Sequence, residues 1–351
     1  MDFIAHAVDS ALSVANMDAV DALRAFFIFA ACTILSVSLP NSLRSRFIPY
    51  GARATSTAAV ETETSASPAS PSSAPPVARA LDYVAKLRVP HSYFTQFYVV
   101  SVLSSIFWAL QLLFHGAAFQ AIATRVGPEH LHQAISINQV MICWGLMLIQ
   151  GLRRLHECLR FSKPSTSEMW FVHWLAGIAF YLAVVVAIWI EGAGPSHLAR
   201  ASRGVTALQG IIQLKRVAGT VLSHELSLDD FSLATRFSGR TLLCLPIFIL
   251  ASGIQHDCHH YLYSLKKYTL PTHPMFSKFV CPHYTAECMI YLSIALLAAP
   301  KGEIINKTVL SALAFVVVNL GITASTTRQW YRQKFGEEAV RGKWNMIPII
   351  Y

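Results

Sequence analysis

The sequence predicts an all-α polytopic membrane protein with about seven transmembrane helices, a luminal N-terminus and a cytosolic C-terminus. Of its 351 residues, 54% are hydrophobic and 13% are charged, whereas a soluble domain has about 25% charged residues. The apolar residues gather in blocks of roughly 18–20, the length that crosses the hydrocarbon core of a bilayer. The 28 Lys and Arg residues lie between these blocks, so the net charge indicates membrane topology and not a nucleic-acid partner.

Seven apolar blocks give the expected spans, two of them short: 23–39, 97–114, 134–151, 170–190, 241–254, 285–299 and 308–324. Acidic residues precede the first block, where a secretory signal would have a basic region, so this block is expected to remain as an uncleaved span. The half-apolar segment 204–222 contains Lys215 and Arg216. We expect it to be interfacial or re-entrant.

The basic residues predict the orientation. They concentrate in the loops after the first, third and fifth blocks and after the last block, whereas the loop after the second block has only Arg125 and the loop after the sixth has Lys301 and Lys307. Short loops rich in Lys and Arg stay on the cytosolic side. The loop after the fourth block also has six basic residues, but it spans about fifty residues, a length at which the rule weakens. This asymmetry predicts the cytosolic C-terminus.

The chain is expected to have four parts. Residues 1–53 hold the first span, and 54–80 form a disordered loop, because 21 of the 25 residues at 54–78 are Ala, Ser, Thr or Pro and cannot bury enough apolar surface to order the chain. Residues 81–240 hold spans two to four, and residues 241–351 hold the last three.

The densest polar cluster, at 255–260, lies at the cytosolic end of the fifth span. His256-x-x-His259-His260 has the spacing of a histidine box in a membrane di-iron hydroxylase, but the other histidines form no second box, and such a site needs several boxes. A second interpretation is that these histidines simply end a helix at the interface.

A third interpretation is a ligand-binding stripe. If the helix continues past the membrane edge, Gln255, His259, Tyr263 and Lys266 share one face with a positive end, which suits a phosphate-bearing ligand. Thirty residues on, Glu287 lies within or beside the sixth span. An ionisable residue there is a functional candidate, with a structural ion pair as the alternative.

The C-terminal third contains an ordered series of short motifs: Gln255-x-x-Cys258-His259, Leu265-Lys266-Lys267, Pro282-His283-Tyr284-x-x-Glu287, Trp330-Tyr331 and Ile347-Pro348-Ile349-Ile350-Tyr351. The series resembles the C-terminal domain of the steroid 5α-reductase family. Two upstream stretches, 89–98 and 152–159, resemble its polyprenol (polyprenal) reductase branch.

The resemblance implies a multi-pass enzyme of the endoplasmic-reticulum membrane that uses NADPH to saturate a carbon–carbon double bond conjugated to a carbonyl. It implies an NADPH-binding domain at 241–351 and a substrate side at 81–240, with no metal. The implied cofactor contacts are Arg154, Gln255, His259, Lys266, His283, Glu287 and Tyr331. Glu287 and Tyr331 would orient the nicotinamide end.

Two departures argue against a steroid substrate. Steroid-specific relatives hold the steroid ketone with a Glu and a Tyr, but no Glu lies near Gln96, and the position of the Tyr corresponds to Gly151. Tyr93 and Tyr98 are the remaining candidates for polarising a carbonyl, because a phenol can donate a hydrogen bond to a developing oxyanion.

The resemblance therefore implies reduction of the α-isoprene unit of polyprenal or polyprenol, the step that makes dolichol for protein N-glycosylation, with a long polyprenoid lipid as substrate. A 3-oxo-5α-steroid 4-dehydrogenase or an enoyl-thioester reductase of the same superfamily is the nearest alternative. A di-iron hydroxylase and a non-enzymatic scaffold or transporter are more distant ones.

The orientation can be tested directly. A reporter domain fused after Tyr351 is expected to be digested by protease added outside sealed microsomes, because the basic-loop asymmetry places this end in the cytosol. Protection of the reporter would contradict the predicted topology.

Overall fold

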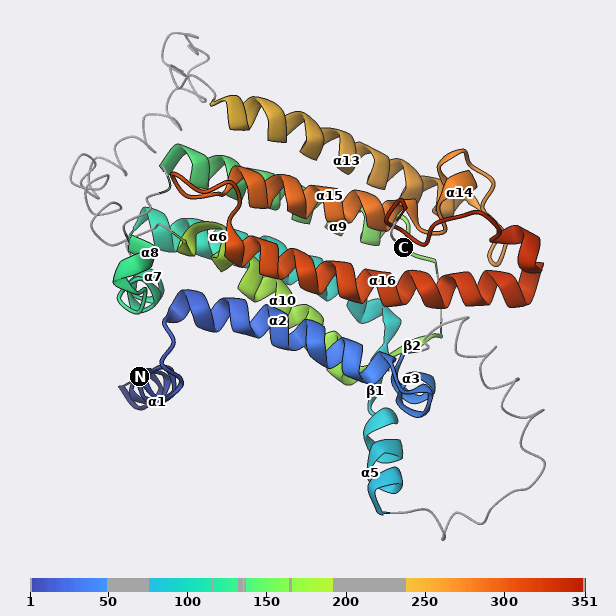
Figure 1. Cartoon of the computed structure of the whole chain (residues 1–351), viewed down its shortest axis with the longest axis horizontal. Helices are drawn as coiled ribbons and strands as arrows, with labels where there is room; N and C mark the ends of the chain where they lie inside the picture. Colours follow the sequence, from blue (N-terminus) through green and yellow to red (C-terminus); the bar gives the residue numbers. More distant parts are fainter. Residues whose placement is uncertain are drawn as a thin grey trace.

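Seven helices pack side by side in the computed structural model, which describes residues 2–48, 76–114, 116–131, 135, 137–163, 166–191, 238–349 and 351 (Figure 1). They are α2 (Ala19–Ser38), α6 (Phe94–Leu113), α9 (Ile137–Arg160), α10 (Phe171–Ile190), α13 (Gly239–Ser264), α15 (Pro282–Leu297) and α16 (Lys307–Phe335). The closest neighbours are α13 with α15, α2 with α16, and α6 with both α9 and α10. Each of the seven predicted blocks thus corresponds to a helix.

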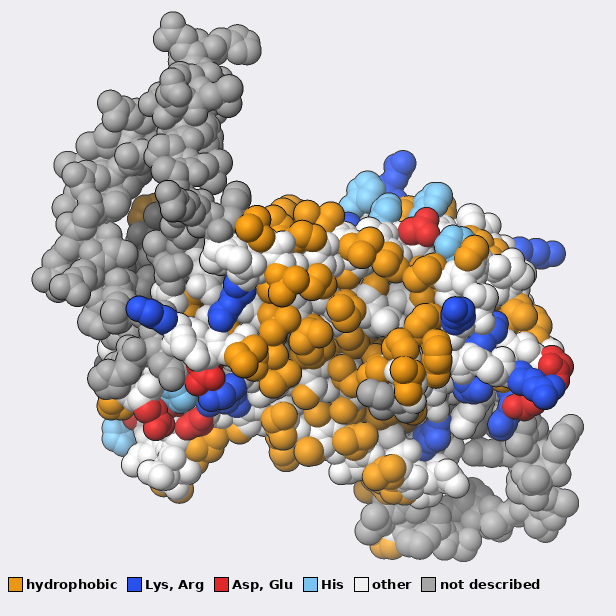
Figure 2. All heavy atoms as spheres, turned by 45° about the horizontal axis from the view of Figure 1, so that its top comes forward, with side chains coloured by type: hydrophobic (Ala, Val, Ile, Leu, Met, Phe, Trp, Pro, Cys, Tyr) orange, Lys and Arg blue, Asp and Glu red, His pale blue; other side chains and the backbone are white. Residues whose placement is uncertain are grey.

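Five of these helices are long and apolar enough to cross a membrane within the described residues: α2, α6 with the turn before it, α10, α13 and α16. The number expected was about seven. Helix α15 has only 16 residues, and α9 includes the charged residues from Arg153 onward. Figure 2 shows a broad apolar surface over the middle of the bundle, with charged side chains toward its ends, as a membrane protein requires.

Shorter elements flank the bundle at its two ends: α1 (Asp2–Ala15), α3 (Asn41–Phe47), α5 (Pro76–Ala85), η1 (His91–Tyr93), α7 (Ala117–Ala123), α8 (Pro128–Leu131), α14 (Met275–Lys278) and η2 (Glu337–Ala339). Helix α5 corrects the end of the loop expected at 54–80, because residues 76–80 are helical. Pro76 opens the helix with its backbone angle already set, and Ala and Leu favour its continuation. The rest of that loop, 54–75, and the segment 204–222 lie outside the described residues.

A small antiparallel ribbon departs from the all-α prediction. Strand β1 (Arg88–Pro90) pairs with β2 (Glu168–Trp170), with Val89 opposite Met169. The strands precede α6 and α10, so the ribbon fixes the starting points of these helices relative to each other. Three residues are too few to give the alternation that identifies a strand in a sequence.

Aromatic side chains fill the centre of the bundle. Phe180 of α10 lies 5.0 Å from Phe315 of α16 and 5.9 Å from both Tyr291 of α15 and Phe27 of α2, measured between ring centroids. All four helices therefore meet at one ring, and this contact holds α10 against the C-terminal helices.

A buried carboxylate closes the end of the bundle where α16 begins. Glu191 follows α10 and accepts hydrogen bonds from Arg24 Nη2 at 2.6 Å, from the backbone N–H of Thr308 at 2.7 Å and from that of Lys307 at 3.2 Å. The N–H groups at the start of a helix have no partner within the helix and carry partial positive charge. Glu191 therefore ties α2, α10 and α16 together.

Replacing Glu191 should destabilise the bundle. Glu191→Gln is expected to reduce the free energy of unfolding by about 2 kcal/mol, because it leaves the partly buried Arg24 without its main counter-ion. Thermal unfolding of the purified protein in detergent measures this change. Glu303→Gln, which breaks the more exposed Lys307–Glu303 pair, should cost less than about 0.5 kcal/mol. Equal effects of the two substitutions would contradict the role of Glu191.

Candidate active site

The other end of the bundle contains a buried carboxylate surrounded by cationic and imidazole groups. Glu157 of α9 is 2% exposed. Arg153 and Arg154 donate to it from the same helix, and the Nδ1 atoms of His256 and His259 on α13 lie 2.7 Å from its two oxygens. All four groups thus converge on one carboxylate.

Helix geometry explains half of this arrangement. Residues three and four apart share a helix face, so Arg153 and Arg154 both reach Glu157 on α9. His256 and His259 are three apart on α13 and face α9 together. The approach of α9 and α13 completes the cluster.

A tyrosine from a third helix joins the cluster through Arg154. The phenol oxygen of Tyr98, on α6, accepts from Arg154 Nη2 at 2.8 Å and from Nε at 3.1 Å. The guanidinium carbon also lies 4.8 Å from the centre of the Tyr98 ring. Tyr98 also shares a side-chain hydrogen bond with Tyr181 of α10. Because the two bonds from Arg154 use the oxygen lone pairs of Tyr98, the phenol hydrogen points to an acceptor other than Arg154.

Two buried glutamines connect the cluster to α15. Arg153 donates to Gln150 Oε1 at 2.8 Å and to Gln255 Oε1, and Gln255 Nε2 donates to Glu287 on α15. Gln150 Nε2 also lies 3.1 Å from Gln255 Oε1. The polar network therefore extends from α6 through α9 and α13 to α15.

His283 lies beside this network in the first turn of α15. Its ring centroid is 5.3 Å from that of His259 and 4.3 Å from that of Tyr284. Its Nδ1 atom is buried and has no hydrogen-bond partner among the described residues, and the same holds for Arg153 Nε. Buried polar atoms without partners are costly, so both atoms are suited to a polar ligand.

The structure brings together six of the residues predicted from the sequence: Tyr98, Arg154, Gln255, His259, His283 and Glu287. Tyr93 lies apart in η1, 39% exposed and 6.2 Å from Trp174 between ring centroids. Tyr331 of α16 packs with a second apolar group that includes Val280 and Met346. The same group includes Tyr284 and Cys288, the chain neighbours of His283 and Glu287.

The predicted polar stripe is correct for its first half and wrong for its second. Gln255 and His259 lie in the network, and α13 continues past the apolar block as required. The helix ends at Ser264, however, and Leu265 is extended, so Lys266 leaves the helical face. Tyr263 stacks on Phe161, with ring centroids 5.3 Å apart. Lys266 is exposed.

Four residues of the network were not among the predicted cofactor contacts or catalytic candidates: Gln150, Arg153, Glu157 and His256. The Arg-Arg-x-x-Glu spacing at 153–157 could have identified Glu157, because it predicts two ion pairs on one helical turn. The partnership with His256 depends on how α9 packs on α13, which the sequence alone does not contain.

The histidines of the predicted box contact protein groups in this structure. His256 and His259 lie at hydrogen-bond distance from the Glu157 carboxylate, and His260 packs against Phe161.

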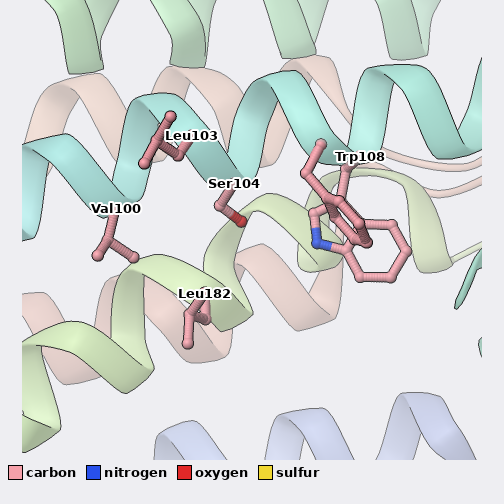
Figure 3. Close-up of a pocket in the computed structure, with 6 residues that line it drawn as sticks. Val100, Leu103, Ser104, Trp108 and Leu182 are labelled. Atoms are coloured by element: carbon pink, nitrogen blue, oxygen red, sulfur yellow. The ribbon is translucent and has the colours of Figure 1, made fainter.

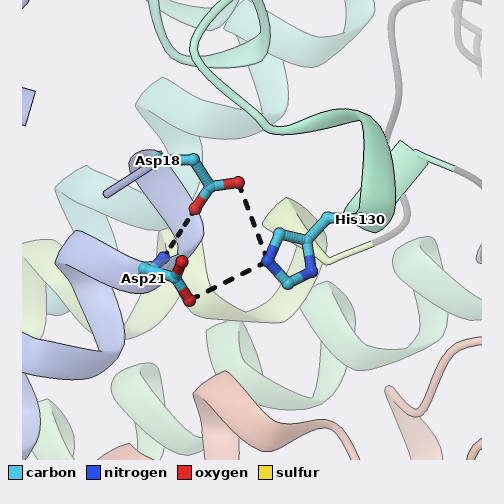
Figure 4. A group of neighbouring side chains, drawn as sticks. All are labelled: Asp18, Asp21 and His130. Carbon is cyan, nitrogen blue, oxygen red and sulfur yellow. Dashed lines mark hydrogen bonds and ion pairs between the residues drawn. The ribbon is translucent and has the colours of Figure 1, made fainter. Parts of the chain in front are cut away.

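In the described part of the chain, a different group, Asp18, Asp21 and His130, has side-chain atoms within 4.8 Å of one another (Figure 4). Asp18 accepts from the N–H groups of Asp21 at 2.8 Å and Gly127 at 2.6 Å. It thereby caps α2 and holds the loop that leads to α8.

Comparisons with known proteins show what the chain is similar to. Residues 209–351 match the family model described as 3-oxo-5-alpha-steroid 4-dehydrogenase. A protein named polyprenal reductase 1 from Oryza sativa subsp. indica is 29% identical over 298 residues, which cover 76% of this chain and 80% of the relative.

Two animal relatives are similar to a comparable degree. The polyprenal reductase of Xenopus laevis is 28% identical over 284 residues, 75% of this chain and 78% of the relative. That of Homo sapiens is 27% identical over 288 residues, 75% of this chain and 76% of the relative. These similarities extend well upstream of the matched C-terminal region. The C-terminal region of the chain is thus similar to the 3-oxo-5-alpha-steroid 4-dehydrogenase family, and these three relatives, which are similar to most of the chain, are named polyprenal reductases.

Proposed function

We propose that this protein is an NADPH-dependent reductase of the endoplasmic-reticulum membrane that saturates the α-isoprene unit of polyprenal, in the formation of dolichol. The names of the relatives support the substrate. The observation that carries the chemistry is the buried Tyr98 phenol, held by two hydrogen bonds from Arg154. It offers a hydrogen-bond donor backed by a fixed positive charge.

The reaction needs such a donor. Addition of hydride to the β-carbon of a conjugated aldehyde moves negative charge onto the aldehyde oxygen, and a proton then adds to the α-carbon of the resulting enolate. A donor that is already oriented stabilises the developing oxyanion by several kcal/mol. Tyr98 takes this role, and Arg154 holds the phenol and strengthens it electrostatically. An allylic alcohol such as polyprenol has no oxygen that could accept the charge in this way.

The residues present fit a bound NADPH, which would supply the hydride. His283 Nδ1 and Arg153 Nε provide buried polar atoms without partners, and Gln255 and Glu287 provide amide and carboxylate groups for hydrogen bonds beside them. The phosphates need cations outside the core, because Glu157 and Glu287 already balance Arg153 and Arg154. Lys266, exposed just beyond the end of α13, is the proposed phosphate contact.

A steroid enone is the second candidate, favoured by the description of the family model. The packing around Gly151 argues against it. A β-carbon at Gly151 would lie 3.0 Å from Ser101 Oγ and 3.4 Å from Val102. The close contact of α6 and α9 therefore leaves little room for the tyrosine by which steroid-specific relatives hold the ketone.

The lipid tail of the substrate leaves the site along α6 and α10. An apolar groove of about 440 Å³ lies between these helices, lined by Val100, Leu103, Ser104, Phe107, Trp108 and Leu182 (Figure 3). Its lining residue Val100 is two residues from Tyr98 on α6, and Leu182 follows Tyr181, whose ring lies 5.4 Å from that of Tyr98. A flexible isoprenoid chain gains free energy in proportion to the apolar surface that it buries there.

The central experiment compares the aldehyde with the alcohol. Purified protein with NADPH is expected to convert polyprenal to dolichal and to give almost no saturated product from polyprenol, because only the aldehyde can delocalise the added charge. Tyr98→Phe should reduce turnover of polyprenal by roughly 100-fold, the usual contribution of one oxyanion donor. Product analysis by mass spectrometry decides the outcome. Preferential reduction of a steroid enone, or direct reduction of polyprenol without an oxidising partner, would refute the proposal.

The groove can be tested by chain length. Leu103→Trp is expected to raise KM roughly fivefold for a long-chain polyprenal, a loss of about 1 kcal/mol, and to leave KM unchanged for an enal of two isoprene units. Leu103 is 60% exposed on the groove, so the fold tolerates the larger ring. Leu250→Trp on α13, 65% exposed, is the matched control and should change neither constant. An equal effect on both chain lengths would place the tail elsewhere.

A further inference from the structure

Glu157 connects more of the candidate site than any residue selected from the sequence. We propose that Glu157 is a positioning residue that fixes the direction of Arg154 and the tautomer of His259, and so prepares the site for both the cofactor and the carbonyl. This inference rests on the proposed function. It assigns to a carboxylate with no expected role the task of orienting two groups that are expected to touch ligands.

The carboxylate has every acceptor position occupied. One oxygen, Oε1, takes Arg153 Nη1 and His256 Nδ1, and the other, Oε2, takes Arg154 Nη1 and His259 Nδ1. An ionised carboxylate can accept about four hydrogen bonds. Because Glu157 is 2% exposed, protein groups hold it in one orientation. Two guanidinium groups offset the cost of burying its charge.

The same carboxylate decides the state of His259. Its Nδ1 atom lies 2.7 Å from Glu157 Oε2 and also 2.7 Å from Arg154 Nη1. An ionised carboxylate only accepts and a guanidinium only donates, so these neighbours favour opposite tautomers. With Glu157 present, Nδ1 carries the hydrogen and Nε2 of the neutral ring is an acceptor. Without it, Nδ1 would accept from Arg154, and Nε2 would become a donor.

Glu157 also acts on Tyr98 through Arg154. Glu157 accepts a hydrogen bond from Nη1 of the guanidinium. The other two nitrogens, Nε and Nη2, are then directed at the phenol oxygen, 3.1 and 2.8 Å away. The guanidinium is planar and rigid, so fixing one nitrogen fixes the others. Loss of Glu157 would free the group to turn, and the Tyr98 phenol would lose its defined support. Carboxylates that orient a histidine or arginine in this way typically contribute 10- to 100-fold in activity or ligand affinity.

A purely structural tie between α9 and α13 is the competing explanation, and kinetics can separate the two. In Glu157→Gln, the amide has the size of the carboxylate but presents N–H donors to a ring of donors. In Glu157→Asp, the charge is kept on a shorter side chain. Asp257→Asn, on α13 with its side chain 62% exposed and His273 as its partner at 3.5 Å, is the matched control.

The experiment uses the full-length protein in detergent and measures NADPH Kd by fluorescence, kcat and KM with polyprenal, and thermal stability. Glu157→Gln is expected to raise the Kd for NADPH about tenfold and to lower kcat about 100-fold, with little change in KM for polyprenal. Glu157→Asp should recover at least tenfold of the lost kcat, and Asp257→Asn should match the unmodified protein.

Two results would overturn the inference. One is a Glu157→Gln protein that keeps kcat and NADPH Kd within twofold. The other is a loss in Glu157→Gln that follows thermal stability alone and is not rescued by Glu157→Asp. If the unmodified protein binds NADPH but reduces no polyprenal, the proposed function fails, and the ratio of NADPH Kd values still decides the role of Glu157.

Discussion

The buried Glu157 carboxylate is the interaction on which the rest of the polar end of the bundle depends. It brings two arginines and two histidines from α9 and α13 to one point. In an apolar setting, each of these groups would be costly without a partner. Most polar atoms of the network around Glu157 have hydrogen-bond partners. Two buried atoms, His283 Nδ1 and Arg153 Nε, have none among the described residues. A site in which only a few buried polar atoms lack partners can bind a polar ligand at those atoms without admitting bulk water.

The opposite end of the bundle also contains a buried carboxylate with several hydrogen-bond donors, but there it stabilises the packing of helices. Glu191 also receives an arginine and hydroxyl and backbone donors, but its partners are the N-terminal turn of α16 and the Arg24 side chain of α2. That arrangement satisfies helix ends and offers nothing to a ligand. Between the two carboxylates, the aromatic group around Phe180 holds the helices together. The carboxylate at one end of the bundle thus stabilises the packing of the helices, and the carboxylate at the other end lies in the candidate active site.

The sequence was sufficient for the helices and for part of the site. The apolar blocks identified the seven helices of the bundle, five of which are long and apolar enough to cross a membrane, because the hydrophobic pattern depends on local composition alone. Tyr98, Arg154, Gln255, His259, His283 and Glu287 came from motif resemblance, and the structure gathers them. Lys266 follows the end of α13 at Ser264, and Tyr331 packs in the apolar group around Val280 and Met346; both placements depend on tertiary contacts. His256 and the β1–β2 ribbon were missed because their partners are some 80 to 100 residues away in the chain.

The spacing of Arg153, Arg154 and Glu157 on a single helical turn bears on the biogenesis of the protein. Synthesis proceeds from the N-terminus, so α9 emerges about 100 residues before the histidines of α13 that complete the cluster. During that interval the two guanidiniums already have a counter-ion three and four residues away on the same helix. Helix α9 can therefore reach the translocation machinery with part of its charge neutralised from within. The later helices are then added to a segment whose two guanidinium groups already share one carboxylate.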